Sequence, residues 1–206
     1  MSGAFPISTA KFETLGIRSI QKTIISKSDS GKKLARQIDG QRFGFTARII
    51  TAKRSDVYGD LMAFIIKQRS GKENFTIIPP DVSSTKGSEG GTVLVNGVHA
   101  VGDTTIALDG FASDGAGRFK AGDLIKFASH SKVYMVIDDV TSSSNAATVT
   151  IEPPLIADIA NDSTVTYDNV PFTVHLVNDV QSFGTVGADK DGNLLYKYEL
   201  DVEETT

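Results

Sequence analysis

The chain has 206 residues and a net charge of −4, which gives it no general attraction to nucleic acid or to anionic membranes. It contains no cysteine, which excludes thiol catalysis, disulfides and Cys-ligated metal sites. Its N-terminus has no signal-peptide pattern, and no apolar run approaches the ~20 residues of a membrane span. A chain of this length can form one large β domain or two small ones.

The first elements in chain order are two predicted strands. Residues 16–28 have Ile and Thr in the middle and are followed by a polar turn. Residues 42–52 alternate strictly, with Phe43, Phe45 and Ile49 on one face and charged or hydroxyl side chains on the other. This period of two predicts a strand with one buried face.

The period changes at Ser55, where the sequence predicts a helix over residues 55–70. Apolar residues recur at helical spacing, so that one stripe faces the core. Its members are Val57, Leu61, Phe64, Ile65 and Gln68.

Beyond the helix, residues 74–80 form a short predicted strand that ends at two prolines. Residues 81–91 are polar and rich in Gly and Ser, which predicts a flexible linker. Residues 92–166 then contain short strands at regular spacing, separated by turn residues. This pattern is typical of a small β-barrel or sandwich.

Two strands are predicted to close the chain, at 171–180 and 194–202. The stretch "DKDGN" at 189–193 matches the first three ligand positions of an EF-hand loop. However, Leu194 stands where that loop needs Gly, and Leu200 stands where it needs Glu. We therefore expect a hairpin turn that does not bind calcium, and we expect the acidic end "DVEETT" to be a solvated strand end.

Together these elements predict a mainly β protein. Residues 1–87 and 168–206 are expected to form a discontinuous, β-sandwich-like, ring-forming domain on which helix 55–70 packs. Residues 92–166 are expected to form an inserted small β-barrel or sandwich module that projects from the ring and is partly independent of it.

No motif in the chain indicates catalysis. His99, His130 and His175 are too far apart in the sequence to form a local metal pair, and no nucleophile, zinc or phosphate-binding motif is present. We therefore predict no catalytic, cofactor-binding or metal-binding residues and no cofactor, and we expect that the protein is not an enzyme.

The order of motifs resembles a known family. It comprises "RFGFTARI", the helix-containing run "DVYGDLMAFIIKQRSGKENFTIIPP", an insert that opens with "VNGVHAVGDTTIALDGF" and ends with "ATVTIEPPL", and a closing "LLYKYELDVEE". This arrangement resembles structural tail proteins of tailed bacteriophages, of the distal tail or baseplate-adaptor type. Within it, Leu61, Phe64 and Ser70–Gly71 follow the helix spacing of that family, and Phe75, Ile77 and Pro80 follow its next strand.

The resemblance implies a structural virion protein of the phage tail that is assembled in the host cytoplasm. Its subunits would form a homo-oligomeric ring, a hexamer, at the distal end of the tail tube. That ring would contact the tail tube and baseplate hub proteins, connect the tube to the baseplate or host-recognition apparatus, and let DNA pass through its lumen without a membrane partner.

Two alternatives stay open. The chain could contain a carbohydrate-binding module, with residues 92–166 facing the sugar, or it could be a glycan-degrading enzyme that acts in host adsorption. Binding to a glycan array would favour the module. Turnover of a polysaccharide that is lost on removal of one carboxylate would favour the enzyme.

Overall fold

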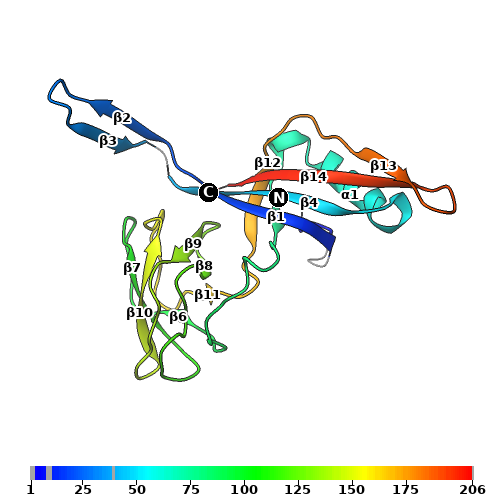
Figure 1. Ribbon diagram of the computed structural model, residues 1–206. Helices are drawn as coiled ribbons and strands as arrows, with labels where there is room; N and C mark the ends of the chain where they lie inside the picture. The colour runs from blue at the N-terminus through cyan, green and yellow to red at the C-terminus, as the bar shows by residue number, and fades with distance from the viewer. Residues whose placement is uncertain (1–2, 8–10, 39, 206) are drawn as a thin grey trace.

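The protein is mainly β, as predicted, with 43% of the described residues in strands and 9% helical. The computed structural model describes residues 3–7, 11–38 and 40–205 (Figure 1). The strands are β1 (Phe12–Ile20), β2 (Thr23–Lys27), β3 (Lys33–Gln37), β4 (Arg42–Lys53), β5 (Phe75–Ile77), β6 (Leu94–Val95), β7 (Thr105–Asp109), β8 (Leu124–Phe127), β9 (Val133–Val136), β10 (Ala146–Glu152), β11 (Val165–Thr166), β12 (Phe172–Leu176), β13 (Gly184–Ala188) and β14 (Leu194–Glu204). The helical segments are η2 (Arg54–Tyr58), α1 (Gly59–Lys67) and η3 (Ser70–Lys72). No helix among these described residues has the length and apolar character needed to cross a membrane.

The first sheet joins strands from both ends of the chain, in the order β1-β4-β14-β12-β5, with β13 paired to the first half of β14. Its centre is the long antiparallel pair β4 and β14, which runs from Lys53 opposite Leu195 to Gly44 opposite Glu203. The last strand of the chain therefore lies at the middle of this sheet (Figure 1).

The two faces of the first sheet differ, as the alternation predicts. Phe45 and Ile49 of β4 and Leu200 of β14 are completely buried on one face. The opposite face carries ion pairs between strands, including Arg48 with Glu199 at 2.8 Å. An α-helix, rather than a second sheet, packs on the apolar face, and its residues belong to the same hydrophobic cluster.

The helix begins and ends earlier than predicted. A π-helical turn, η2, starts at Arg54, and α1 ends at Lys67, three residues before the predicted end. Arg69 and Ser70 adopt left-handed backbone angles, with φ of 52° and 59°, which interrupt the helix before η3. The predicted apolar stripe is confirmed, because four of its members are buried and Phe64 is partly buried, packed against the core. The buried members are Val57, Leu61, Ile65 and Gln68.

The second sheet has the order β11-β8-β9-β10-β7-β6. A bridge between Leu94 and Thr164 brings its first and last strands together, so that the sheet is nearly a closed barrel. It encloses a hydrophobic cluster of its own that includes Phe119, Phe127 and Ile151. We call residues 85–168 the second unit and the first sheet with its helix the first unit. Whether the two fold independently stays a prediction.

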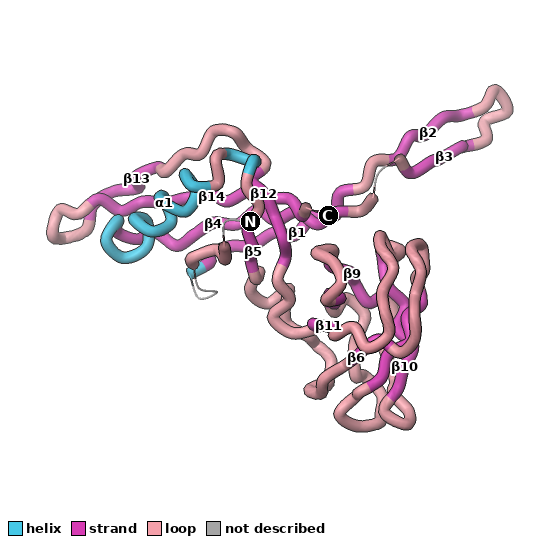
Figure 2. The backbone as a smooth tube through the Cα atoms, turned by 180° about the vertical axis from the view of Figure 1, so that it is seen from behind, coloured by secondary structure: helices cyan, strands magenta, loops and turns pink. Residues whose placement is uncertain are grey.

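The strand predicted at 16–28 is divided into β1 and β2. β2 leaves the first sheet and pairs only with β3 in a separate two-stranded sheet. Both views of the backbone show this hairpin projecting from the first unit (Figures 1 and 2). We call residues 21–38 the arm.

Replacing Leu61 by Asp tests the packing of α1. Leu61 is completely buried, so the variant places an unpaired carboxylate in the apolar cluster. We expect the free energy of unfolding, measured by urea denaturation, to fall by about 3 kcal/mol or more.

The matched control for this test is Ile66→Asp on the same helix, because Ile66 is 73% exposed. We expect it to change the stability by less than about 0.5 kcal/mol. Equal effects of the two variants would show that the helix does not pack as described.

Candidate functional site

The arm is exposed along its whole length. All ten strand residues of β2 and β3 are accessible to solvent. Four large apolar side chains on it are between 52 and 57% exposed, namely Ile24, Ile25, Leu34 and Ile38. A lone two-stranded hairpin is marginally stable in water. An apolar hairpin without a core of its own is therefore a candidate contact surface for another molecule.

One edge of the first sheet is open. Among the described residues, β1 pairs with β4 alone, so the outer backbone groups of this nine-residue strand face away from the sheet. The opposite outer strand, β5, is covered, because Phe5 donates its backbone N–H to Thr76 O at 2.7 Å and Thr76 donates to Gly3 O. An open edge can pair with another chain. Together the edge and the arm form a candidate assembly surface.

A buried ion pair fixes the second unit against the first. Lys132 Nζ lies 2.5 Å from Glu204 Oε2, and both side chains have no exposure to solvent. Glu204 also accepts the backbone N–H groups of Val133 and Phe43, at 2.8 and 3.1 Å. Lys132 donates a further hydrogen bond to Gln41 at 3.0 Å. The two units thus meet through a network in which each charge has several partners.

The environment of Lys132 lowers its pKa. Burial is the main cause, and the Glu204 carboxylate partly offsets it by favouring the ammonium form. The ammonium also lies 4.9 Å from the centre of the Phe43 ring. The prediction of a solvated acidic end is wrong for Glu204, because this residue continues the apolar face of β14 into the junction with the second unit.

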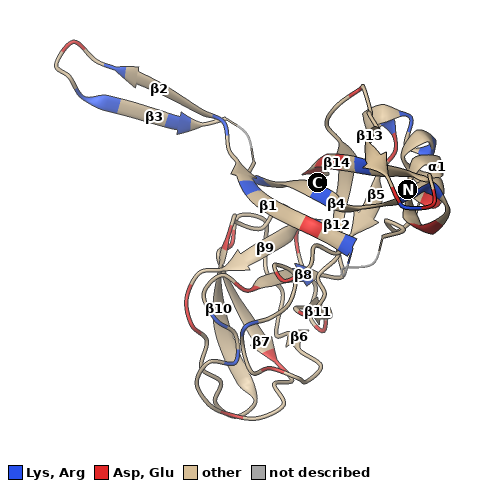
Figure 3. Cartoon of the chain, turned by 45° about the vertical axis from the view of Figure 1, so that its right-hand side comes forward, with Lys and Arg blue, Asp and Glu red and all other residues tan. Residues whose placement is uncertain are grey.

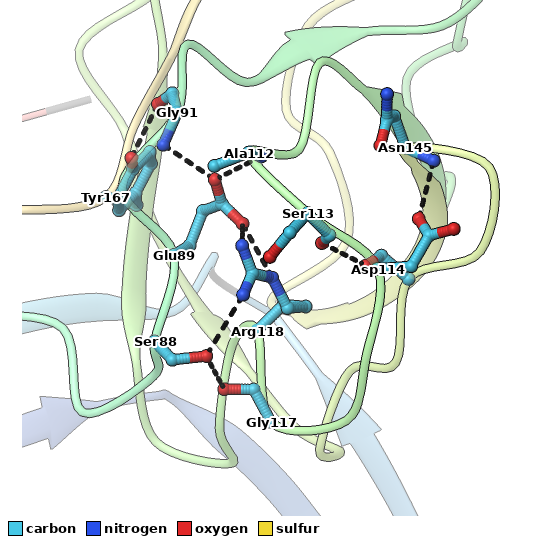
Figure 4. Close-up of polar contacts among 11 residues, drawn as sticks. Ser88, Glu89, Gly91, Ala112, Ser113, Asp114, Gly117, Arg118, Asn145 and Tyr167 are labelled. Atoms are coloured by element: carbon cyan, nitrogen blue, oxygen red, sulfur yellow. Dashed lines mark hydrogen bonds and ion pairs between the residues drawn. The ribbon is translucent and has the colours of Figure 1, made fainter.

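The prediction of a flexible linker at 81–91 is also wrong. The Glu89 carboxylate is buried, accepts N–H groups from Gly91 and Ala112 at 2.7 and 2.9 Å, and pairs with Arg118 at 2.9 Å (Figure 4). Burial alone would raise the pKa of Glu89, but these backbone donors and Arg118 lower it overall. This segment is therefore tied to the second unit.

The glycine at position 87 serves close packing rather than flexibility. A Cβ atom there would lie 2.1 Å from the Arg118 carbonyl oxygen. The Gly87 N–H also donates to the Asp123 carboxylate at 3.2 Å, beside Lys86 N–H at 2.7 Å. Glycine is needed where two backbones approach this closely.

The "DKDGN" segment is a hairpin turn between β13 and β14, and β13 is a strand that the sequence did not predict. Asp189 Oδ1 accepts the N–H groups of Asp191 and Asn193, both at 2.9 Å. Its other oxygen lies 2.5 Å from Lys53 Nζ. The hydrogen bond from Lys53 is the main reason that the pKa of Asp189 is lowered, followed by those from Asn193. This carboxylate therefore holds the turn and already has a cation beside it.

The three histidines lie in separate hydrogen-bonded positions. His99 Nε2 accepts from Ala107 N–H at 3.2 Å, and the ring nitrogens of His130 and His175 lie within hydrogen-bonding distance of Tyr134 and Thr205 hydroxyls, at 2.6 and 2.9 Å. Burial lowers the pKa of His130 and raises that of Tyr134 to about 12. In the described part of the chain, no three His, Asp or Glu side chains gather in a way that could hold a metal ion.

Residues 80–170 match a family model described as the B domain of the distal tail protein pb9. The matched range contains the whole second unit and the segment that leads into it. No curated protein matches the chain. The family match confirms the resemblance to distal tail proteins of bacteriophages.

The match supports a structural role in a phage tail and a place in the virion tail. The family is one of structural tail proteins rather than of known enzymes. The geometry agrees with this role, because the features that stand out are an exposed arm, an open sheet edge and a buried ion pair that fixes the two units against each other.

Replacing Lys132 by Met tests the junction between the units. The variant keeps much of the side-chain volume but leaves the Glu204 carboxylate buried without its cation. We expect the free energy of unfolding, measured by urea denaturation, to fall by about 3–5 kcal/mol.

Arg48→Met is the control for the junction, because the Arg48–Glu199 pair is exposed to solvent on the first sheet. Loss of an exposed pair should cost less than about 1 kcal/mol. A small effect for both variants would mean that the junction does not hold the two units together.

Calcium titration tests the turn at Asp189. Because Lys53 and two backbone N–H groups occupy this carboxylate, we expect isothermal titration calorimetry to detect no calcium site of micromolar or tighter affinity. A saturable heat signal that disappears in Asp189→Asn would contradict the description of this turn.

Proposed function

We propose that the protein forms a homo-oligomeric ring, a hexamer, at the distal end of a phage tail tube. This ring connects the tube to the baseplate or host-recognition apparatus. Its subunits are assembled in the host cytoplasm, and DNA passes through the ring without being held there. The protein has no catalytic activity in this role.

The arm is the observation that carries this proposal. Its apolar side chains are exposed along an isolated hairpin, and the sheet beside it has one open edge. Contacts between copies would cover both features. When two unlike surfaces meet head to tail, the subunits close into a ring if the rotation from one subunit to the next allows closure. The family match at residues 80–170 supports the location in a tail tip.

The net charge is compatible with a DNA conduit. A chain with a net charge of −4 has no general attraction for the phosphates of passing DNA. Contacts with the tail tube and with baseplate hub proteins belong to this proposal, since a ring at that position must be bound on both of its faces.

Deleting residues 92–166 is a poor test of ring formation. The deletion would remove Lys132 and expose the Glu204 carboxylate at the end of β14. An arm variant is better, because the arm contributes no residue to either hydrophobic cluster.

The test is a triple variant in which Ile24, Ile25 and Leu34 are each replaced by Thr, which preserves strand propensity. We expect wild-type protein to form oligomers in multi-angle light scattering at micromolar concentration. The arm variant should be monomeric with an unchanged circular dichroism spectrum, because the apolar contact area is lost.

The matched control is Val180→Thr, at an apolar residue that is 84% exposed outside the arm. This control should assemble like the wild type. A wild-type protein that stays monomeric well above micromolar concentration would overturn assembly by this chain alone.

A further inference from the structure

Charge is unevenly distributed between the arm and the second unit. Residues 21–38 contain five basic residues and one acidic residue, which gives the arm a charge of +4. Residues 85–168 contain five basic and eleven acidic residues, which gives the second unit a charge of −6 with neutral histidines. Figure 3 shows Lys and Arg on both strands of the arm and several acidic segments on the second unit. One chain therefore carries two oppositely charged surfaces.

The second unit has an ordered surface that is both acidic and apolar. We call residues 96–104 and 152–162 the loop end. Its two segments are joined by hydrogen bonds, from Gly102 N–H to Leu155 O at 2.8 Å and from Val101 N–H to Asp158 Oδ1 at 2.8 Å. The loop end contains four carboxylates and no Lys or Arg; the acidic residues are Asp103, Glu152, Asp158 and Asp162.

Exposed apolar side chains lie among these carboxylates. Val98 and Val101 are 76 and 61% exposed, and Ile156 is 40% exposed. Because the hydrogen bonds hold the two segments together, these side chains lie on an ordered surface. An exposed apolar group with a polar rim is the usual form of a protein contact site.

The arm is complementary to the loop end in both respects. It carries exposed Ile and Leu side chains and a charge of +4 against the four carboxylates of the loop end. Its register places Lys27 directly opposite Lys33, although like charges at such a position destabilise a hairpin. This repulsion is relieved if the two ammonium groups face carboxylates of a partner.

A neighbouring copy can supply the partner carboxylates. Figures 1 and 2 show the arm running outward from the first unit. Only its base lies beside the second unit of the same chain, where Gln21 and Gln37 line a pocket with Glu152 and Pro153. We propose that the arm of each subunit docks on the loop end of the second unit of a neighbouring copy. This inference rests on the proposed ring, and it assigns the second unit a part in ring closure.

The absence of cysteine from the chain permits a direct test by disulfide trapping. Ile25→Cys is placed in one preparation, and Val98→Cys or Val101→Cys in a second preparation with a different mass tag. The two are mixed and oxidised, and the mixed dimer is measured on a non-reducing gel. Because each chain has one thiol, this dimer reports contact between copies only.

Two further partners for Ile25→Cys complete the trapping experiment. Ile17→Cys lies on the open-edge strand β1, and Val186→Cys on β13 is an exposed control. We expect the loop-end thiols to give several-fold more mixed dimer than Val186→Cys. If Ile17→Cys gave more mixed dimer than the loop-end thiols, the inference would be overturned while the proposed ring would stand. The same would follow if neither loop-end thiol gave mixed dimer in a preparation that assembles. A preparation that does not assemble would overturn the proposed ring as well.

Charge reversal provides a second test that needs no cross-link. Lys27→Glu together with Lys33→Glu should weaken assembly about tenfold at low salt, and raised salt should reduce this difference. Glu152→Lys in the mixed partner should restore part of the loss. Asp56→Lys is the control for the partner, because Asp56 is exposed in the first unit and outside the loop end. The assigned contact would be overturned if Asp56→Lys restored assembly as well as Glu152→Lys does, or if Glu152→Lys restored none of the lost assembly.

Discussion

The arrangement of the two units depends on the buried pair between Lys132 and Glu204. The carboxylate lies at the end of the central strand β14 and accepts hydrogen bonds from both units, from Val133 and from Phe43. Leaving either charge buried without the other is costly, so a shifted position of the second unit is strongly disfavoured. Leu124 and Val133 of the second sheet join the hydrophobic cluster of the first unit at the same place. The junction is therefore both charged and apolar.

The proposed ring assembly would make direct use of this junction. The arm projects from the first unit and the loop end belongs to the second, so their relative positions are set by how the units meet. In a ring, a subunit must present its donor and acceptor surfaces at a fixed angle, or the ring will not close. A rigid junction satisfies that need better than a flexible linker would.

Much of the fold follows from simple periodicity in the sequence. Alternation at Phe43, Phe45 and Ile49 predicts the buried face of β4, and helical spacing around Leu61 predicts the packed face of α1. The same alternation in β14 continues to Glu204, two residues after Val202, which was a signal that its carboxylate points toward the core. Its partner Lys132 lies 72 residues away in the chain. No local pattern connects the two.

Composition predicted a flexible linker at residues 81–91, where glycine in fact allows close packing. Residues 81–91 resemble a linker because they are rich in Gly and Ser, but Gly87 allows the chain to approach Arg118 and Glu89 is buried against the same residue. The arm was missed for a related reason, since Ile and Thr continue from β1 into β2 without a strong turn signal. The departure of β2 from the sheet is decided by pairing with β3. Resemblance to a family of tail proteins, rather than periodicity, provided the functional prediction.

Negative-stain electron microscopy of the purified full-length protein tests the central claim most directly. Class averages should show closed rings in which a thin projection from each subunit reaches the second unit of its neighbour. Separate two-lobed particles, or open chains without a closed class at concentrations well above micromolar, would contradict ring assembly. Closed rings with second units that touch no neighbour would contradict the assigned role of the loop end.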